Sequence, residues 1–213
     1  TYWLGLLGRG GAIDVPDKWL SDFHRTFLTH VYITDDKEPG SERYMCRVSS
    51  FYYGVFPNES CMVISELDRR GLHEEAERRL DVFLEYQGTK QIPGNFSSHK
   101  GVYYGAGGYE CGAYGQHHGW VLWCLAEHYR YTHDGEWLMK AAPSMIAACQ
   151  WIIDERKATM KMDRKGRRAI EYGFLPAGPL EDVTEFWFWV ATNVHAHRGL
   201  SSAAKALEEV GHP

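Results

Sequence analysis

Four carboxylates occupy positions in this chain where an acid or a base could act on a ligand. Glu181 and Asp182 are adjacent, directly behind a Pro-Ala-Gly-Pro turn and ahead of an apolar segment. Glu110 lies among glycines in GGYECGAYG, and glycines let a backbone approach a ligand closely. Glu59 follows Pro57 at the start of another apolar run. Two such groups, one protonated and one ionised, can act as a general acid and a general base.

For three of these acids there is a structural alternative. Acidic side chains stabilise the first turn of a helix, and Asp182 with Glu185 three residues later resembles a capping box. Glu59 can serve the same purpose at its own helix start. Glu110 has no obvious helix to serve.

Polar and aromatic side chains near these acids are candidates to bind a substrate. Either histidine of the adjacent pair His117 and His118 could hydrogen-bond hydroxyl groups, although the pair could equally be a polar first turn of a helix. Aromatic faces can stack on a flat ligand. The residues predicted to line the site are Gln116, His117, His118, Tyr109, Tyr114 and Trp120, with Arg47 and Tyr53 as more distant members.

Motifs for metals and common cofactors are missing. The side chains of His117 and His118 would diverge by about 100° on a helix and could not easily share one ion, and no His-Glu-x-x-His spacing occurs. The glycines of GRGG and GAGG lack the companions of a dinucleotide site or a phosphate loop. No Gly-x-Ser-x-Gly elbow occurs either. We therefore expect no metal site and no cofactor.

Length, charge and hydropathy limit the classes of partner. The 213 residues suit a single domain with a substantial core. A net charge of −5 without long basic runs argues against a nucleic-acid partner. No apolar run approaches the roughly 18 residues that a membrane span needs, and no signal-like segment is apparent. The five cysteines lack C-x-x-C spacing and predict neither a disulfide framework nor a zinc site. The cellular compartment stays unknown.

Hydrophobic periodicity predicts about seven helices of two alternating kinds. Segments that begin near residues 59, 116 and 182 are apolar on several faces, which is typical of helices surrounded by others. Segments that carry a single apolar stripe, as surface helices do, run from Asp17 to Val31, over 72–84, over 137–158 and over 200–210.

A recurrent boundary separates three pairs of these helices. In each copy a basic residue or a histidine precedes a glycine, and an amphipathic helix follows. The three copies are DRRGLHEEAERRLDVFL from Asp68, THDGEWLMKAAPSMI from Thr132 and HRGLSSAAKAL from His197. Helix pairs that repeat every roughly 55 to 70 residues indicate stacked antiparallel α-hairpins. The inner helices would then point the same way and gather Glu59, the two histidines, Glu181 and Asp182 around one mouth.

The chain resembles the six-hairpin glycosidases, whose fold is an (α/α)6 toroid. The segments that carry the resemblance are PNESCMVISELDRRGLHEEAERRLDVFLEYQG, GQHHGWVLWCLAEHYRYTHDGEWL and GFLPAGPLEDVTEFWFWVATNVHAHRGLSSAAKALEEVG, about half of the chain. The resemblance implies an all-α fold of stacked antiparallel α-hairpins, a partial or complete toroid that forms one domain over residues 1–213. Because about seven helices are too few for six hairpins, the chain resembles part of a ring, and the domain would be part of a larger one. We therefore expect self-association, or a missing segment that completes the ring.

The same resemblance implies a carbohydrate-active glycoside hydrolase that acts on an oligosaccharide, a polysaccharide or a glycoside. Hydrolysis needs one carboxylic acid to protonate the leaving oxygen and a second carboxylate as base or nucleophile. Glu181 or Asp182 is the predicted first member of this pair, and Glu110 the second, with Glu59 as its replacement.

Two alternatives stay open, because similar toroids also serve other chemistry. A sugar epimerase or polysaccharide lyase would use His117 or His118 with a tyrosine as acid and base. A non-catalytic glycan-binding or assembly module would retain the helical hairpins without turnover.

Overall fold

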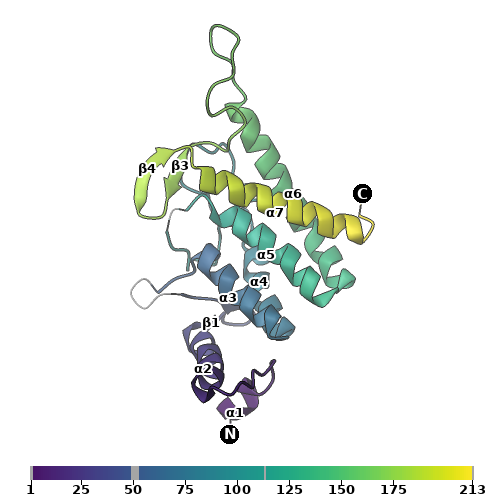
Figure 1. The fold of residues 1–213 in the computed structure, drawn as a ribbon. Coiled ribbons are helices and arrows are strands. Elements are labelled where there is room, and N and C mark those ends of the chain that lie inside the picture. The colour runs from purple at the N-terminus through teal and green to yellow at the C-terminus, as the bar shows by residue number, and fades with distance from the viewer. Residues whose placement is uncertain (1, 49–52, 113, 213) are drawn as a thin grey trace.

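The computed structural model describes residues 2–48, 53–112 and 114–212. Within these ranges it has seven helices and two small antiparallel sheets (Figure 1). The helices are α1 (Tyr2–Leu7), α2 (Lys18–Thr34), α3 (Pro57–Arg69), α4 (His73–Glu85), α5 (His117–Thr132), α6 (Gly135–Thr159) and α7 (Val190–Glu209). The sheets pair β1 (Asp36–Lys37) with β2 (Tyr44–Met45), and β3 (Gly178–Leu180) with β4 (Val183–Trp187).

Helices α3, α5 and α7 form a layer in which all three run in the same direction (Figure 1). Their N-termini lie toward the side of the β3–β4 hairpin. Helix α4 packs on α3 and α5, and α6 packs on α5 and α7, so these two helices return the chain behind the layer. The core lies between the layer and the returning helices, where Ile64, Leu80, Leu122 and Leu138 are fully buried. Burial of these side chains supplies the main drive for the packing.

Two glycines allow α5 and α7 to approach at backbone distance. A Cβ atom added at Gly119 would stand 2.3 Å from the carbonyl carbon of His195, and one added at Gly199 would stand 2.6 Å from the carbonyl oxygen of Gly119. No other residue fits such a contact without moving the backbone. The pair therefore sets how closely the start of α5 packs against the second and third turns of α7.

The predicted all-α toroid is wrong. The residues from Glu181 to Trp187, predicted as the start of an inner helix, form the turn and second strand of the β3–β4 hairpin. Aromatic and β-branched residues fit a strand, and the run of Phe186, Trp187 and Phe188 is apolar without a helical period. A single helix, α7, follows in place of the two shorter helices predicted there. The described residues form an open layer with two small sheets, a mixed fold in which no toroid is closed.

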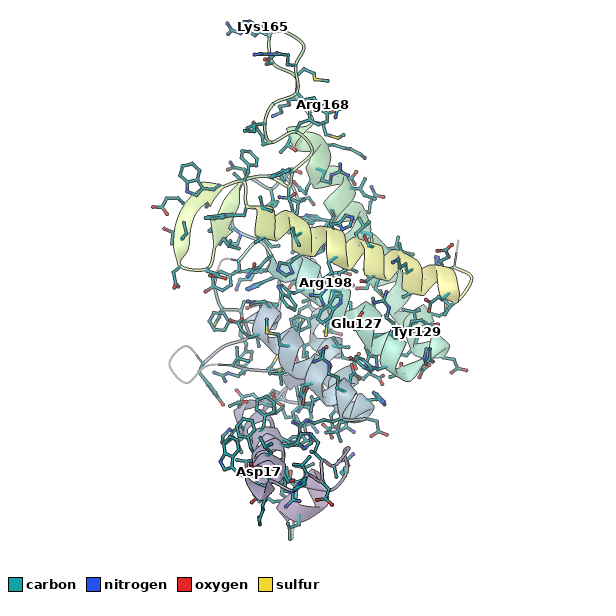
Figure 2. The ribbon with its side chains drawn as sticks, viewed as in Figure 1. Asp17, Glu127, Tyr129, Lys165, Arg168 and Arg198 are labelled. Carbon is teal, nitrogen blue, oxygen red and sulfur yellow. The ribbon has the colours of Figure 1, made fainter. Side chains whose placement is uncertain are left out.

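Helix α2 lies at the N-terminal end of the molecule and is held loosely (Figures 1 and 2). Asp17 caps it as predicted, because its Oδ1 accepts a hydrogen bond from the Trp19 amide at 3.0 Å. Only Leu28 and Val31 of this helix are buried. Its remaining apolar face borders a hollow of about 600 Å³ between α2 and α3. Within the described ranges, no helix combines the length and the hydropathy that crossing a membrane would require.

Candidate functional site

The first turns of α3, α5 and α7 meet around Tyr114. The Tyr114 ring centroid lies 5.0 Å from that of His117, the first residue of α5, and 6.1 Å from that of Phe56, which precedes α3. Next to it, a Cβ atom on Gly115 would lie 3.4 Å from the side chain of Thr192 in the first turn of α7. Three helix N-termini therefore meet here, but the third belongs to α7 and not to the helix predicted to begin near residue 182, where the chain forms a strand.

The β3–β4 hairpin is tied to these helix starts by hydrogen bonds. The Gly115 amide donates to the carbonyl of Pro179 at 3.4 Å. The Trp189 indole N–H, just before α7, donates to the carbonyl of Gly178 at 2.9 Å. Because both bonds hold β3, the turn that follows β3 is held over the same end of the helix layer.

That turn consists of Glu181 and Asp182, and both residues are exposed. Glu181 has φ 52°, a left-handed conformation that is strained for a residue with a Cβ atom. Burial raises the pKa of Tyr114, and the negative charges of Asp182, Glu59 and Glu181 raise it further. Three of the four candidate carboxylates therefore act on one tyrosine.

Glu59 is half-buried in the first turn of α3. Burial raises the pKa of its carboxyl group, and the charge of Glu181 raises it further, against a backbone hydrogen bond that lowers it. Its Oε2 is buried and has no hydrogen-bond partner. A raised pKa at neutral pH is the property that a general acid requires.

Buried polar atoms without partners concentrate at the same place. Among the described residues, nine buried side-chain nitrogen or oxygen atoms lack a hydrogen bond, and five of them belong to the first turns of α3, α5 and α7. They are Asn58 Oδ1, Glu59 Oε2, both ring nitrogens of His117, and Thr192 Oγ1. Each such atom destabilises the protein by roughly 1–3 kcal/mol unless water or a ligand satisfies it. This concentration is typical of a binding site.

The two predicted histidines differ completely in their bonding. His118 accepts a hydrogen bond from the Tyr103 amide at its Nδ1 (3.0 Å) and donates from Nε2 to the carbonyl of Ala148 (3.1 Å), so it joins α5 to α6. His117 is fully buried and stacks on Tyr104 with its ring centroid 5.9 Å away. Burial lowers the pKa of His117 to about 3 and that of His118 to about 4. Both rings are neutral near pH 7.

Glu110 has bonds that fit a structural role. Its Oε1 accepts from the Ala106 amide at 2.5 Å, and its Oε2 pairs with the Lys90 ammonium group at 3.1 Å. Burial raises the pKa of this carboxyl group, but hydrogen bonds from Ala106, from its own and the Gly108 backbone amides and from Lys90 lower it below its usual value. Glu110 is therefore an ionised brace of the glycine-rich loop, with its lone pairs occupied.

Arg47, Tyr53 and Tyr109 form one cluster, and Gln116 lies apart from it at the start of α5. Arg47 lies 3.2 Å from the ring centroid of Tyr53 and 5.3 Å from that of Tyr109, and its charge is paired with Asp36. Gln116 is buried and precedes the first residue of α5.

Trp120 belongs to the contact between α5 and α7. Its ring stacks on His195 with a centroid distance of 4.7 Å, and it packs edge-on against Trp123. Arg198 of α7 covers this pair, with its guanidinium carbon 3.7 Å from the Trp123 centroid (Figure 2).

Sequence reasoning missed Asn58 and Thr192. Asn58 directly precedes the candidate acid Glu59 in the first turn of α3, so its place in the sequence could have identified it as a site residue. Thr192 was placed inside a predicted helix because that helix was started about eight residues too early. A boundary at the end of the aromatic run would have placed a threonine in the first turn of a helix.

The site consists of a half-buried acid with a raised pKa, two exposed carboxylates and neutral hydrogen-bonding groups around the ring of Tyr114. Within the described ranges, no three histidine, cysteine or acidic side chains are arranged to hold a metal ion. No family model, curated protein or solved structure matches the chain.

Proposed function

We propose that the chain is a carbohydrate-active hydrolase that cleaves a glycosidic bond with a pair of carboxylates at the first turns of α3, α5 and α7. The observation that carries the proposal is the raised pKa of Glu59, whose Oε2 is buried without a partner, beside the exposed acids of the β3–β4 turn. Glycoside hydrolysis uses one carboxyl group whose raised pKa favours the protonated form and a second carboxylate as base or nucleophile.

Each carboxylate has a role that follows from its environment. Glu59 donates its proton to the glycosidic oxygen as the bond to the leaving sugar breaks. Asp182 or Glu181 then removes a proton from the water that attacks the anomeric carbon. Alternatively it attacks the anomeric carbon itself, and Glu59, now ionised, takes a proton from the water that hydrolyses the resulting glycosyl ester. Tyr114 keeps its own proton because those charges raise its pKa. It therefore supplies a hydrogen-bond donor and an apolar ring face.

Substitution of Glu59 tests this assignment. Glu59→Gln should lower kcat on a glycoside with a poor leaving group by about 10² to 10⁴. The loss should be much smaller with a dinitrophenyl glycoside, whose leaving group needs no proton. Of Glu181→Gln and Asp182→Asn, the variant that removes the base should lower the activity on both substrates. Initial rates on a panel of both kinds of glycoside provide the measurement.

Glu185→Gln is the matched control, because Glu185 is exposed on β4 of the same hairpin. It should leave both activities unchanged. Full activity of Glu59→Gln on the poor leaving group would refute the proposal. Binding without turnover by the unmodified chain would favour the glycan-binding module instead.

A sugar epimerase or lyase is the second candidate, and the contact of His117 with Tyr114 favours it. That chemistry needs a base strong enough to remove a proton from carbon. A histidine whose pKa burial lowers to about 3 is a weak base at neutral pH. Deuterium uptake at a sugar carbon in D2O, abolished in His117→Gln, would decide for this candidate over hydrolysis.

A further inference from the structure

Three polar side chains at the site have no part in the acid–base pair. Asn58, His117 and Thr192 each come from the first turn of a different helix and are 8%, 0% and 5% exposed. Asn58 Oδ1, Thr192 Oγ1 and both nitrogens of the His117 ring lack partners. All three helices are long enough to direct amide N–H groups at their N-termini toward a ligand.

We propose that Asn58, His117 and Thr192 form a subsite that binds hydroxyl groups of an uncharged sugar. This inference rests on the proposed function and names its substrate class. A hydroxyl group both donates and accepts hydrogen bonds. Asn58 Oδ1 accepts, one His117 nitrogen accepts while the other donates, and Thr192 Oγ1 does either. A polyol offers both kinds of hydrogen bond that these atoms lack.

The charges at the site select an uncharged ligand. The N-termini of α3, α5 and α7 carry partial positive charge, which disfavours a cation. Glu181 and Asp182 of the turn disfavour an anion, and their charges reach Tyr114 within the site. Because burial also keeps His117 neutral, no full positive charge from it is available to hold a phosphate or a uronate. Sugar phosphates, uronates and amino sugars should therefore bind more weakly than the corresponding neutral sugars.

A buried water molecule is the competing occupant, because water also satisfies several polar atoms in a small space. The two occupants predict different behaviour for Thr192→Val. This substitution keeps the volume of the side chain and removes a polar atom that has no partner in the free protein, so it should not lower the melting temperature. If the atom serves a sugar hydroxyl, the same substitution should weaken sugar binding by about tenfold or more.

The experiment measures binding without turnover in the full chain. Methyl glycosides of glucose, galactose and mannose are compared with glucuronate, glucose 6-phosphate and glucosamine. Calorimetry gives the affinities, and ¹⁵N spectra of the histidine rings report on His117, whose signals are assigned with His117→Gln. We expect at least one neutral glycoside to shift the His117 signals and to bind about tenfold more tightly than its charged analogues.

Ser65→Ala is the matched control, because Ser65 Oγ is also buried without a partner but lies in the middle of α3. It should leave sugar affinity unchanged. The proposal is overturned if no glycoside moves the His117 signals, if Thr192→Val binds as tightly as the wild type, or if a charged analogue binds best. If Glu59→Gln keeps full turnover while these binding results hold, the hydrolase mechanism fails and the subsite stands.

Discussion

At the scale of single residues, hydrogen bonding separates neighbours that look equivalent in the chain. His117 and His118 are consecutive and both fully buried, yet one joins two elements and the other has no hydrogen bond. Glu59 and Glu110 differ in the same way, since one carboxyl group has an unpartnered oxygen and the other is bound by amides and a lysine. An unpartnered group is available to a substrate, whereas a bonded group supports the structure.

The buried histidines should make the fold sensitive to mild acid. Burial lowers the pKa of His117 from 6.5 to about 3 and that of His118 to about 4, so between these values the unfolded chain binds protons that the folded chain does not. The free energy of unfolding should therefore fall as the pH drops from 6.5 toward 4. Each histidine should contribute up to about 1.4 kcal/mol per pH unit.

Urea unfolding at pH 7, 6 and 5 measures this slope. His117→Gln should reduce this slope by up to about 1.4 kcal/mol per pH unit, whereas His30→Gln, at an exposed position on α2, should leave it unchanged. An identical slope in wild type and His117→Gln would contradict the assignment.

At the scale of elements, the site depends on how a hairpin and a helix junction are held. The carbonyls of Gly178 and Pro179 connect β3 to the starts of α7 and α5. Asn193 adds a second connection, because its Oδ1 accepts from the Leu175 amide at 2.8 Å. These bonds hold Glu181 and Asp182 near Tyr114, so the hairpin supplies the base or nucleophile of the proposed acid–base pair.

Replacement of Gly119 by alanine should separate α5 from α7. The added Cβ atom would stand 2.3 Å from the His195 carbonyl carbon, and backbone at that distance must shift. We expect a loss of about 3 kcal/mol or more in the free energy of unfolding, together with loss of activity as Thr192 moves away from Gly115. Denaturant unfolding and initial rates provide the measurements.

Gly135→Ala is the control for this change, because an added Cβ atom there meets only a valine methyl group at 3.8 Å. Alanine in the first turn of α6 should be neutral or stabilise by up to about 1 kcal/mol. Equal effects of the two substitutions would show that the contact between α5 and α7 is not tight.

At the scale of the whole molecule, the layer has two apolar edges that the described residues leave exposed. One edge is the hollow between α2 and α3, where Leu20 and Phe23 are exposed. The other is the outer side of β4 and α7, where Trp187, Val190 and Val194 are more than half exposed. Apolar patches of this kind mark interaction surfaces. They agree with the expectation of a partner or a further segment beside the layer, which stays a prediction.

Of these expected partners, a second copy of the chain can be tested directly. Sedimentation velocity should show an average mass that increases with concentration in the micromolar range. Trp187→Ser or Phe23→Ser should reduce the association, because each removes a large exposed apolar group. Ile170→Ser should not, because Ile170 is fully exposed in the loop between α6 and β3, which extends away from the layer (Figure 1). A single monomeric species at every concentration would refute the prediction.

The sequence by itself determined most of the helices, because their signals are local. The Asp17 cap, the apolar period of residues 72–84 and the glycine after each basic boundary all act within a few residues of the helix end they define. The same locality let two of the three predicted inner helix starts be placed correctly, at α3 and α5, whereas the third, near residue 182, was wrong. Tertiary structure alone decided that the segment from Val183 to Trp187 is a strand, since an uninterrupted apolar run has no period to distinguish helix from strand. It also decided which histidine is bonded, which acid is paired with Lys90 and which acid is buried beside Glu181. Those outcomes depend on atoms that come from distant parts of the chain, and the free energy of a buried charge or hydrogen bond depends on those atoms.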